Sequence, residues 1–76
     1  MTLADLEKGT SAQVKTVDSE NQAATRLMEM GVLPGTRLKV VKSAPFGDPI
    51  QIRIKGYDLA LRLNEAKAIE VAKLES

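Results

Sequence analysis

The chain has 76 residues and a net charge of +1, and a domain of this length buries only about 60% of the surface that its unfolded chain would expose. Apolar residues make up 43% of the sequence and charged residues 28%, as in an ordinary globular protein. Cysteine and histidine are both absent. Their absence excludes disulfides and thiolate metal sites, and it removes the commonest general base and the commonest transition-metal ligand.

Catalytic signatures are also missing. No serine, threonine or lysine has a histidine or cysteine partner, no two carboxylates have a recognisable catalytic spacing, and no GxxxxGKS/T phosphate loop is present. No apolar run approaches the roughly 20 residues that span a bilayer, and the N-terminus lacks a signal-peptide pattern. We therefore expect a cytoplasmic, non-enzymatic protein without a cofactor or metal site, whose residues 1–76 form one domain.

The first residues of the chain predict a short helix followed by a strand. Thr2 and Asp5 have the spacing of a capping box, so a helix of about two turns should begin here and end at Gly9. Residues 13–17 are typical of a strand, with Val14 as its surest buried position.

The clearest helix covers about residues 19–30. Ser19 stands three residues before Gln22, which is again a capping-box spacing, and Gly31 suits the left-handed conformation that ends many helices. An apolar stripe at helical spacing should pack on the core, although it could instead form an adaptable binding surface. The stripe consists of Ala23, Ala24, Leu27, Met28 and Met30.

Alternating apolar and polar residues then predict four strands, at residues 36–42, 50–55, 57–63 and 69–72. Pro34-Gly35 suits a type II turn, Lys55-Gly56 suits a tight turn, and residues 64–67 have room for one helical turn. Tyr57 should begin its strand with its ring on the buried face and its hydroxyl near the surface, in a structural role. The expected fold is mainly β, a small SH3-like barrel of about five antiparallel strands with one inserted helix, partly open at its edges.

Four blocks, in matching order and at matching separations, resemble a known family. They are Arg26 to Thr36, Ala44 to Pro49, Lys55 to Arg62 and Glu65 to Val71, and the opening from Leu3 to Gly9 adds to the match. Together they resemble the ferrous iron transport protein A (FeoA) family over nearly the whole chain. The resemblance implies a cytosolic SH3-like barrel, in the standalone form of a module that also ends the iron-dependent repressors.

The resemblance also implies a function. The family works with a membrane ferrous iron transporter that carries a cytoplasmic GTPase domain (FeoB-type), and it is thought to act as an accessory or regulator through protein–protein contact. The implied partner is this transporter, with the chain peripheral to the membrane at most and with no nucleic acid bound. A metallochaperone that itself carries iron is a further hypothesis, although neither histidine nor cysteine is present to form a tight site.

The loop between the second and third of the five strands is the first candidate for a partner-binding surface. A large apolar side chain at its tip, Phe46, is of the kind that anchors interfaces, while the prolines stiffen the backbone. The candidate residues are Pro45, Phe46, Gly47, Asp48 and Pro49. Alternatively, Phe46 folds back to cap the end of the barrel and the prolines only shape the hairpin.

Basic residues concentrate between residues 36 and 55, where five bases accompany one acid, whereas the rest of the chain has six bases and nine acids. They are Arg37, Lys39, Lys42, Arg53 and Lys55. Such a face could steer docking to an acidic patch or to anionic lipid headgroups, or it could be a solvated face that keeps the sheet from pairing with other chains.

Two further hypotheses use the same part of the chain. The alternative function is a small-barrel nucleic-acid-binding module that uses the basic face of strands 36–42 and 50–55. The near-neutral net charge and the two aromatic residues in the whole chain count against it, because single-strand binders rely on stacking aromatics. Edge strands and an exposed apolar loop would also support weak self-association.

Overall fold

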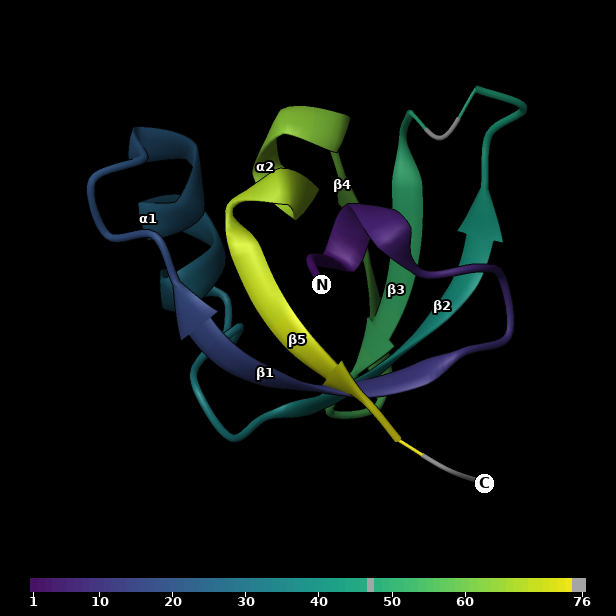
Figure 1. The fold of residues 1–76 in the computed structure, drawn as a ribbon, viewed down its shortest axis with the longest axis horizontal. Helices are drawn as coiled ribbons and strands as arrows, with labels where there is room; N and C mark the ends of the chain where they lie inside the picture. Colours follow the sequence, from purple (N-terminus) through teal and green to yellow (C-terminus); the bar gives the residue numbers. More distant parts are fainter. Residues whose placement is uncertain (47, 75–76) are drawn as a thin grey trace.

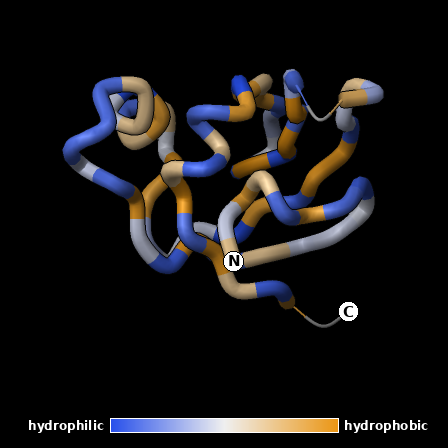
Figure 2. Tube along the Cα trace, turned by 45° about the horizontal axis from the view of Figure 1, so that its top comes forward, coloured by the Kyte–Doolittle hydropathy of each residue, from blue (hydrophilic) through white to orange (hydrophobic). Residues whose placement is uncertain are grey.

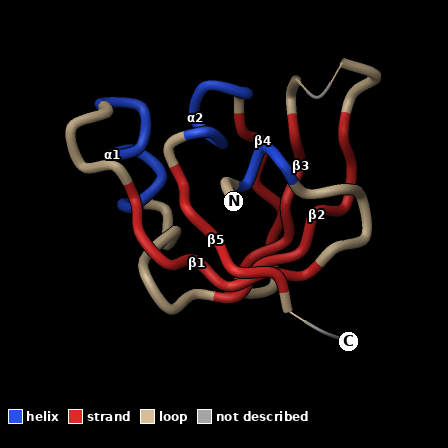
Figure 3. The backbone as a smooth tube through the Cα atoms, in the orientation of Figure 1, coloured by secondary structure: helices blue, strands red, loops and turns tan. Residues whose placement is uncertain are grey.

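The computed structural model describes residues 1–46 and 48–74 and shows a strongly curved antiparallel sheet with short helices around its open side (Figure 1). In chain order the elements are the 3-10 helix η1 (Leu3–Asp5), β1 (Ser11–Val17), α1 (Gln22–Glu29), β2 (Arg37–Ser43), β3 (Ile50–Ile54), β4 (Tyr57–Leu61), α2 (Leu63–Lys67) and β5 (Ile69–Lys73). Figure 3 shows these helices and strands in the same orientation. Within the described residues, no helix is long and apolar enough to cross a membrane.

Two irregularities bend the sheet. Its strands lie in the order β4-β3-β2-β1-β5. The pairing shifts between Val14 and Thr16 where β1 meets β5, and between Val40 and Lys42 where β2 meets β3. A bulge of this kind bends the strand and increases its local twist. The sheet therefore curls into the partly open barrel that the sequence predicts (Figure 1).

The core lies inside this curl. β3 buries Ile50, Ile52 and Ile54, each at most 3% exposed, while Gln51 and Arg53 between them turn to the other face. Figure 2 shows the same alternation as changing colour along the strands. A slip of one residue would exchange the two sets, so the register of β3 is strongly specified.

The N-terminal segment covers the open side of the barrel, where η1 lies beside α2 (Figure 1). Leu3 and Leu6 are both buried in the core, as expected. The capping box of Thr2 and Asp5 also forms, with the Thr2 N–H donating to Asp5 Oδ2 at 2.8 Å. The prediction of two helical turns ending at Gly9 is wrong, because the chain is already extended at Leu6.

The predicted start of α1 is also wrong, because the helix begins at Gln22 and is capped by Asn21 rather than by Ser19. The Asn21 Oδ1 accepts a hydrogen bond from the backbone of the second helical residue at 2.9 Å. Asp18 explains the difference, since its carboxylate and carbonyl accept hydrogen bonds from the backbone N–H groups two and three residues later. These bonds form a turn ahead of the helix.

The apolar stripe of α1 packs on the core only in part. Ala24 and Leu27 are completely buried. Met30, in contrast, is 36% exposed, so the expectation that it packs in the core is wrong. Met30 is the C-terminal cap of the helix, and the chain reverses at Gly31, whose φ is +103°. Met30 therefore lies at the end of the stripe, where its Sδ accepts a hydrogen bond from Arg26 Nη1 at 3.4 Å.

Tyr57 follows its prediction in part. It shares the inward side of β4 with the buried Leu59, yet it is 41% exposed, because it lies at the end of the strand beyond the core. Its hydroxyl donates a hydrogen bond to the carbonyl of Met30. The ring therefore connects the start of β4 to the end of α1 instead of filling the barrel.

The glycine turns form as predicted. Gly35 has a φ of +91°, and the Thr36 N–H donates to the Leu33 carbonyl at 3.0 Å, as a type II turn requires. Lys55 and Gly56 both have positive φ, of 51° and 86°. Two consecutive positive φ angles are typical of the type I′ turn, whose twist matches that of an antiparallel hairpin.

One buried carboxylate connects the two α-helices. The side chain of Glu65, 5% exposed, accepts a hydrogen bond from the Arg26 guanidinium at 2.7 Å and another from the Arg62 N–H at 2.8 Å. Burial alone would raise the pKa of Glu65, but the Arg62 N–H, the Arg26 hydrogen bond and the positive charge of both arginines together lower it below its usual value. Glu65 therefore stays ionised, caps α2 and attaches α1 to it.

We predict that Ile52→Ala lowers the free energy of unfolding by about 2–5 kcal/mol, because it removes a completely buried side chain at the centre of the core. Lys39 on the neighbouring strand is exposed, so Lys39→Ala should change the free energy of unfolding by less than about 0.5 kcal/mol. Urea unfolding measures both. An Ile52→Ala variant as stable as the wild type would contradict the register described above.

We predict that Arg26→Ala lowers the free energy of unfolding at pH 7 by about 1.5–3 kcal/mol, since it leaves the buried Glu65 carboxylate without its cationic donor. The folded-state pKa of Glu65 is lowered. The ion pair therefore stabilises fully above the unfolded-state pKa of about 4.3, and this stabilisation is lost as the pH falls through the folded-state value.

Unfolding curves at pH 7 and pH 3 should therefore show a smaller difference between Arg26→Ala and wild type at the lower pH. Thr25→Ala, an exposed position on the same helix, is the matched control. If Arg26→Ala lowers the free energy of unfolding by the same amount at pH 7 and at pH 3, the ion pair with Glu65 is not the source of the loss.

Candidate protein-interaction site

The loop between β2 and β3 exposes a large aromatic side chain. Phe46 is 94% exposed, so the alternative in which it caps the end of the barrel is wrong. Pro45, Asp48 and Pro49 are exposed as well, and Gly47 lies outside the described residues. The loop therefore presents Phe46 to the solvent as a group that a partner could cover.

Hydrogen bonds anchor this loop at its base. The Ala44 N–H donates to the Pro49 carbonyl at 3.1 Å, which closes the two ends of the loop onto each other. The Asp48 Oδ1 accepts a hydrogen bond from the Leu63 N–H at 3.2 Å and so connects the loop to the start of α2. Asp48 therefore has a structural contact, while the side chain of Phe46 is almost fully exposed.

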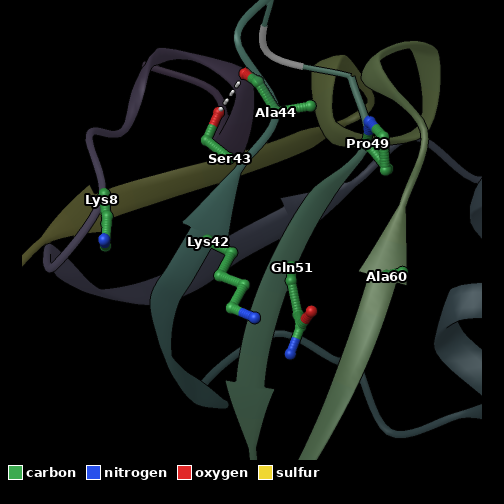
Figure 4. A pocket seen from close by; sticks show the side chains of 7 residues that line it. All are labelled: Lys8, Lys42, Ser43, Ala44, Pro49, Gln51 and Ala60. Carbon is green, nitrogen blue, oxygen red and sulfur yellow. Dashed lines mark hydrogen bonds between the residues drawn. The ribbon is translucent and has the colours of Figure 1, made fainter.

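A shallow hollow of about 420 Å³ lies beside the loop on the outer face of the sheet (Figure 4). It is lined by Lys8, Lys42, Ser43, Ala44, Pro49, Gln51 and Ala60. In Figure 4 the side chains of Lys42 and Gln51 lie over the same face of β2 and β3. The lining combines two ammonium groups with an amide, a hydroxyl and small apolar side chains. We call Phe46 together with the lining of this hollow the loop face.

The sequence pattern gives no indication of Lys8, Gln51 or Ala60 as site residues. Lys8 is near the hollow because the connection between η1 and β1 pairs with β2. The Gly9 N–H donates to the Val40 carbonyl at 2.7 Å, and the Val40 N–H donates to the Thr10 carbonyl at 3.0 Å. These contacts join segments far apart in sequence, so no local pattern could reveal them.

The predicted basic residues are all exposed, but they do not form one compact site. Lys39 and Arg53 lie opposite each other on β2 and β3. Arg37 and Lys55 lie at the ends of these strands away from the loop, roughly 13 Å from Gln51 at about 3.3 Å per residue. Of the expected basic cluster, only Lys42 lines the hollow.

Asp58 of β4 neutralises part of this basic face. The Arg53 Nε donates to Asp58 Oδ1 at 3.0 Å, and the Gln51 Nε2 donates to Oδ2 at 2.9 Å. The Arg53 hydrogen bond, against the opposing effect of desolvation and with smaller contributions from Gln51 and Lys42, lowers the pKa of Asp58 below its usual value. Arg53 therefore keeps its anionic partner at neutral pH.

Two other surface features lie outside the loop face. A second hollow, of about 410 Å³, lies where α1 approaches α2 and includes the Arg26–Glu65 ion pair in its lining. Exposed apolar side chains of Met30, Leu33 and Tyr57 lie at the other end of the sheet. In residues 1–46 and 48–74 there is no group of three or more acidic side chains placed to hold a metal ion.

Comparison with known proteins identifies relatives over the whole fold. A family model described as the FeoA domain matches residues 1–73. The chain is 36% identical over 76 residues to the "Fe(2+) transport protein A/Fe(2+) transporter FeoB fusion protein" of Porphyromonas gingivalis. The match covers all of this chain but only 9% of the fusion protein.

Solved structures agree with this fold. The FeoA protein of Chlorobium tepidum is 41% identical, with a TM-score of 0.88 over 99% of this chain and 71% of its own. FeoA of Stenotrophomonas maltophilia, a prokaryotic SH3 domain protein solved in complex with zinc, is 34% identical, with a TM-score of 0.83 over 95% of this chain and 89% of its own. A manganese-dependent transcriptional repressor, at 24% identity, shares the fold alone.

We predict that Phe46→Ser changes the free energy of unfolding by less than about 0.5 kcal/mol, because the side chain is 94% exposed. Thermal and urea unfolding measure this difference. A loss comparable to that of a core substitution would show that Phe46 packs against the barrel after all.

Proposed function

Because the chain belongs to the FeoA domain family, we propose that it is a non-enzymatic accessory and regulatory protein of ferrous iron uptake, acting in the cytoplasm by protein–protein contact. Its proposed partner is the GTPase-containing cytoplasmic part of a membrane ferrous iron transporter of the FeoB type. Family membership links the chain to ferrous iron transport. The contact and its regulatory effect are the proposal.

The fusion protein of Porphyromonas gingivalis is the main support for this partner. There, a segment similar to all 76 residues of this chain is joined to an Fe(2+) transporter FeoB in one polypeptide. A short flexible linker between two parts gives an effective concentration on the order of millimolar, at which even a weak contact is populated. A contact between two such parts needs a suitable surface on each of them.

The loop face supplies such a surface. It presents one exposed aromatic side chain, which is the kind of group that contributes most of the binding energy at interfaces. Beside it lies the hollow with Lys8 and Lys42 on its lining. Cationic groups of this kind accelerate association with an acidic partner, an effect that salt weakens.

The proposal is tested by titrating the protein against the isolated cytoplasmic part of the transporter from the same organism. Calorimetry measures binding with GDP and with a non-hydrolysable GTP analogue, and a phosphate assay measures GTP turnover. We expect binding whose affinity depends on the nucleotide, together with a change in turnover. Absence of binding in both nucleotide states would contradict the proposal.

Phe46→Ser is the informative variant in this titration. Loss of a well-packed aromatic anchor should weaken binding by about tenfold or more, while the fold stays intact. A variant that binds as tightly as the wild type would remove Phe46 from the interface.

The nucleic-acid alternative requires one additional measurement. Arg53, a member of the proposed basic face, is paired with Asp58, which reduces the charge available to phosphates. Elution from a heparin column at low salt, compared with a basic protein standard, would agree with the proposed function. Strong retention that falls steeply with salt would favour the alternative.

A further inference from the structure

We propose that the hollow of the loop face binds an acidic segment of the partner, with carboxylates at Lys8 and Lys42 and a neighbouring apolar residue against Phe46. This inference rests on the proposed function, because the segment would belong to the cytoplasmic part of the transporter. It adds the chemistry of the contact: an extended stretch of chain in which acidic and apolar side chains are adjacent.

The charge of the hollow supports an acidic ligand. Two lysines and no acidic residue line it. Neither lysine forms an ion pair with any residue in the described part of the chain. Asp58 lies close enough for its charge to interact with that of Lys42, but its two oxygens already accept hydrogen bonds from Arg53 and Gln51. An incoming carboxylate would thus gain charge-assisted hydrogen bonds without displacing an internal partner.

The second hollow provides an internal comparison. It contains two cationic side chains, Arg26 and Arg62, but unlike the hollow of the loop face it also contains an acidic one, Glu65, whose buried carboxylate the Arg26 guanidinium binds at 2.7 Å. A ligand carboxylate there would compete with a contact on which the packing of α1 and α2 depends. Charge complementarity therefore points to the hollow of the loop face and not to this one.

The shape of the hollow depends on small side chains. Ala60 of β4 lies opposite Gln51 of β3, and its methyl group leaves the surface open where a longer side chain would fill it. Ala44 and Pro49 form the lining next to the loop. Phe46 lies in the same loop, two residues after Ala44, and is 94% exposed, so we place the apolar residue of the segment against it.

Two variants test charge and space separately. Lys42→Glu reverses one of the two charges, and Ala60→Leu fills the hollow without adding charge. Both positions are exposed, so both variants should melt like the wild type. Lys73→Glu, an exposed lysine on β5, is the control for overall charge. Calorimetry against the cytoplasmic part of the transporter gives the dissociation constants.

We expect Lys42→Glu and Ala60→Leu each to weaken binding by about tenfold or more, and Lys73→Glu by less than about twofold. Added salt should weaken wild-type binding more than that of Lys42→Glu. These results together would support the hollow as the docking site.

Several outcomes would overturn the inference. If Lys42→Glu and Ala60→Leu both bind as tightly as the wild type, the partner docks elsewhere on the protein. The proposed function would still stand in that case. If Lys73→Glu weakens binding as much as Lys42→Glu, only overall charge matters. A dimer of the wild type alone that Ala60→Leu abolishes would assign the hollow to a second copy. No binding by the wild type would overturn both the inference and the proposed function.

Discussion

The burial of every second residue of β3 is the constraint on which the rest of the structure depends. The three isoleucines of this strand occupy the centre of the core, so Gln51 must lie on the opposite face. Pairing with the neighbouring strands then places Lys42 and Ala60 on either side of Gln51. The register that stabilises a core in so short a chain therefore also assembles the outer surface on which the hollow lies.

Features determined by neighbouring residues could be predicted from the sequence, and features determined by distant contacts could not. The alternation of β3 and the turns at Gly35 and Gly56 follow from side-chain period and backbone freedom, and the structure confirms them. The start of α1 was predicted wrongly because Ser19 and Asn21 are both good caps. The choice between them depends on the hydrogen bonds that Asp18 accepts from the Glu20 and Asn21 N–H groups, which the residue type of Asp18 alone does not specify.

The same distinction applies to the candidate site. Its loop could be recognised from local composition, but the exposure of Phe46 could not, because a lone aromatic residue fits both the core and an interface. Lys8 joins the site only through pairing between the first connection and β2. Conversely, Arg37 and Lys55 satisfied a charge pattern but lie away from the loop. The proposed accessory role depends on such a surface, because it rests on recognition of a partner.

Backbone amide chemical shifts of the isotope-labelled protein, recorded while the cytoplasmic part of the transporter is added, test the central claim most directly. They locate a contact without altering any side chain. We predict that the largest changes fall on the loop face, at Lys8, Lys42, Phe46, Gln51 and Ala60. Changes confined to the opposite end of the sheet, around Met30, Leu33 and Tyr57, would contradict it, as would an unchanged spectrum.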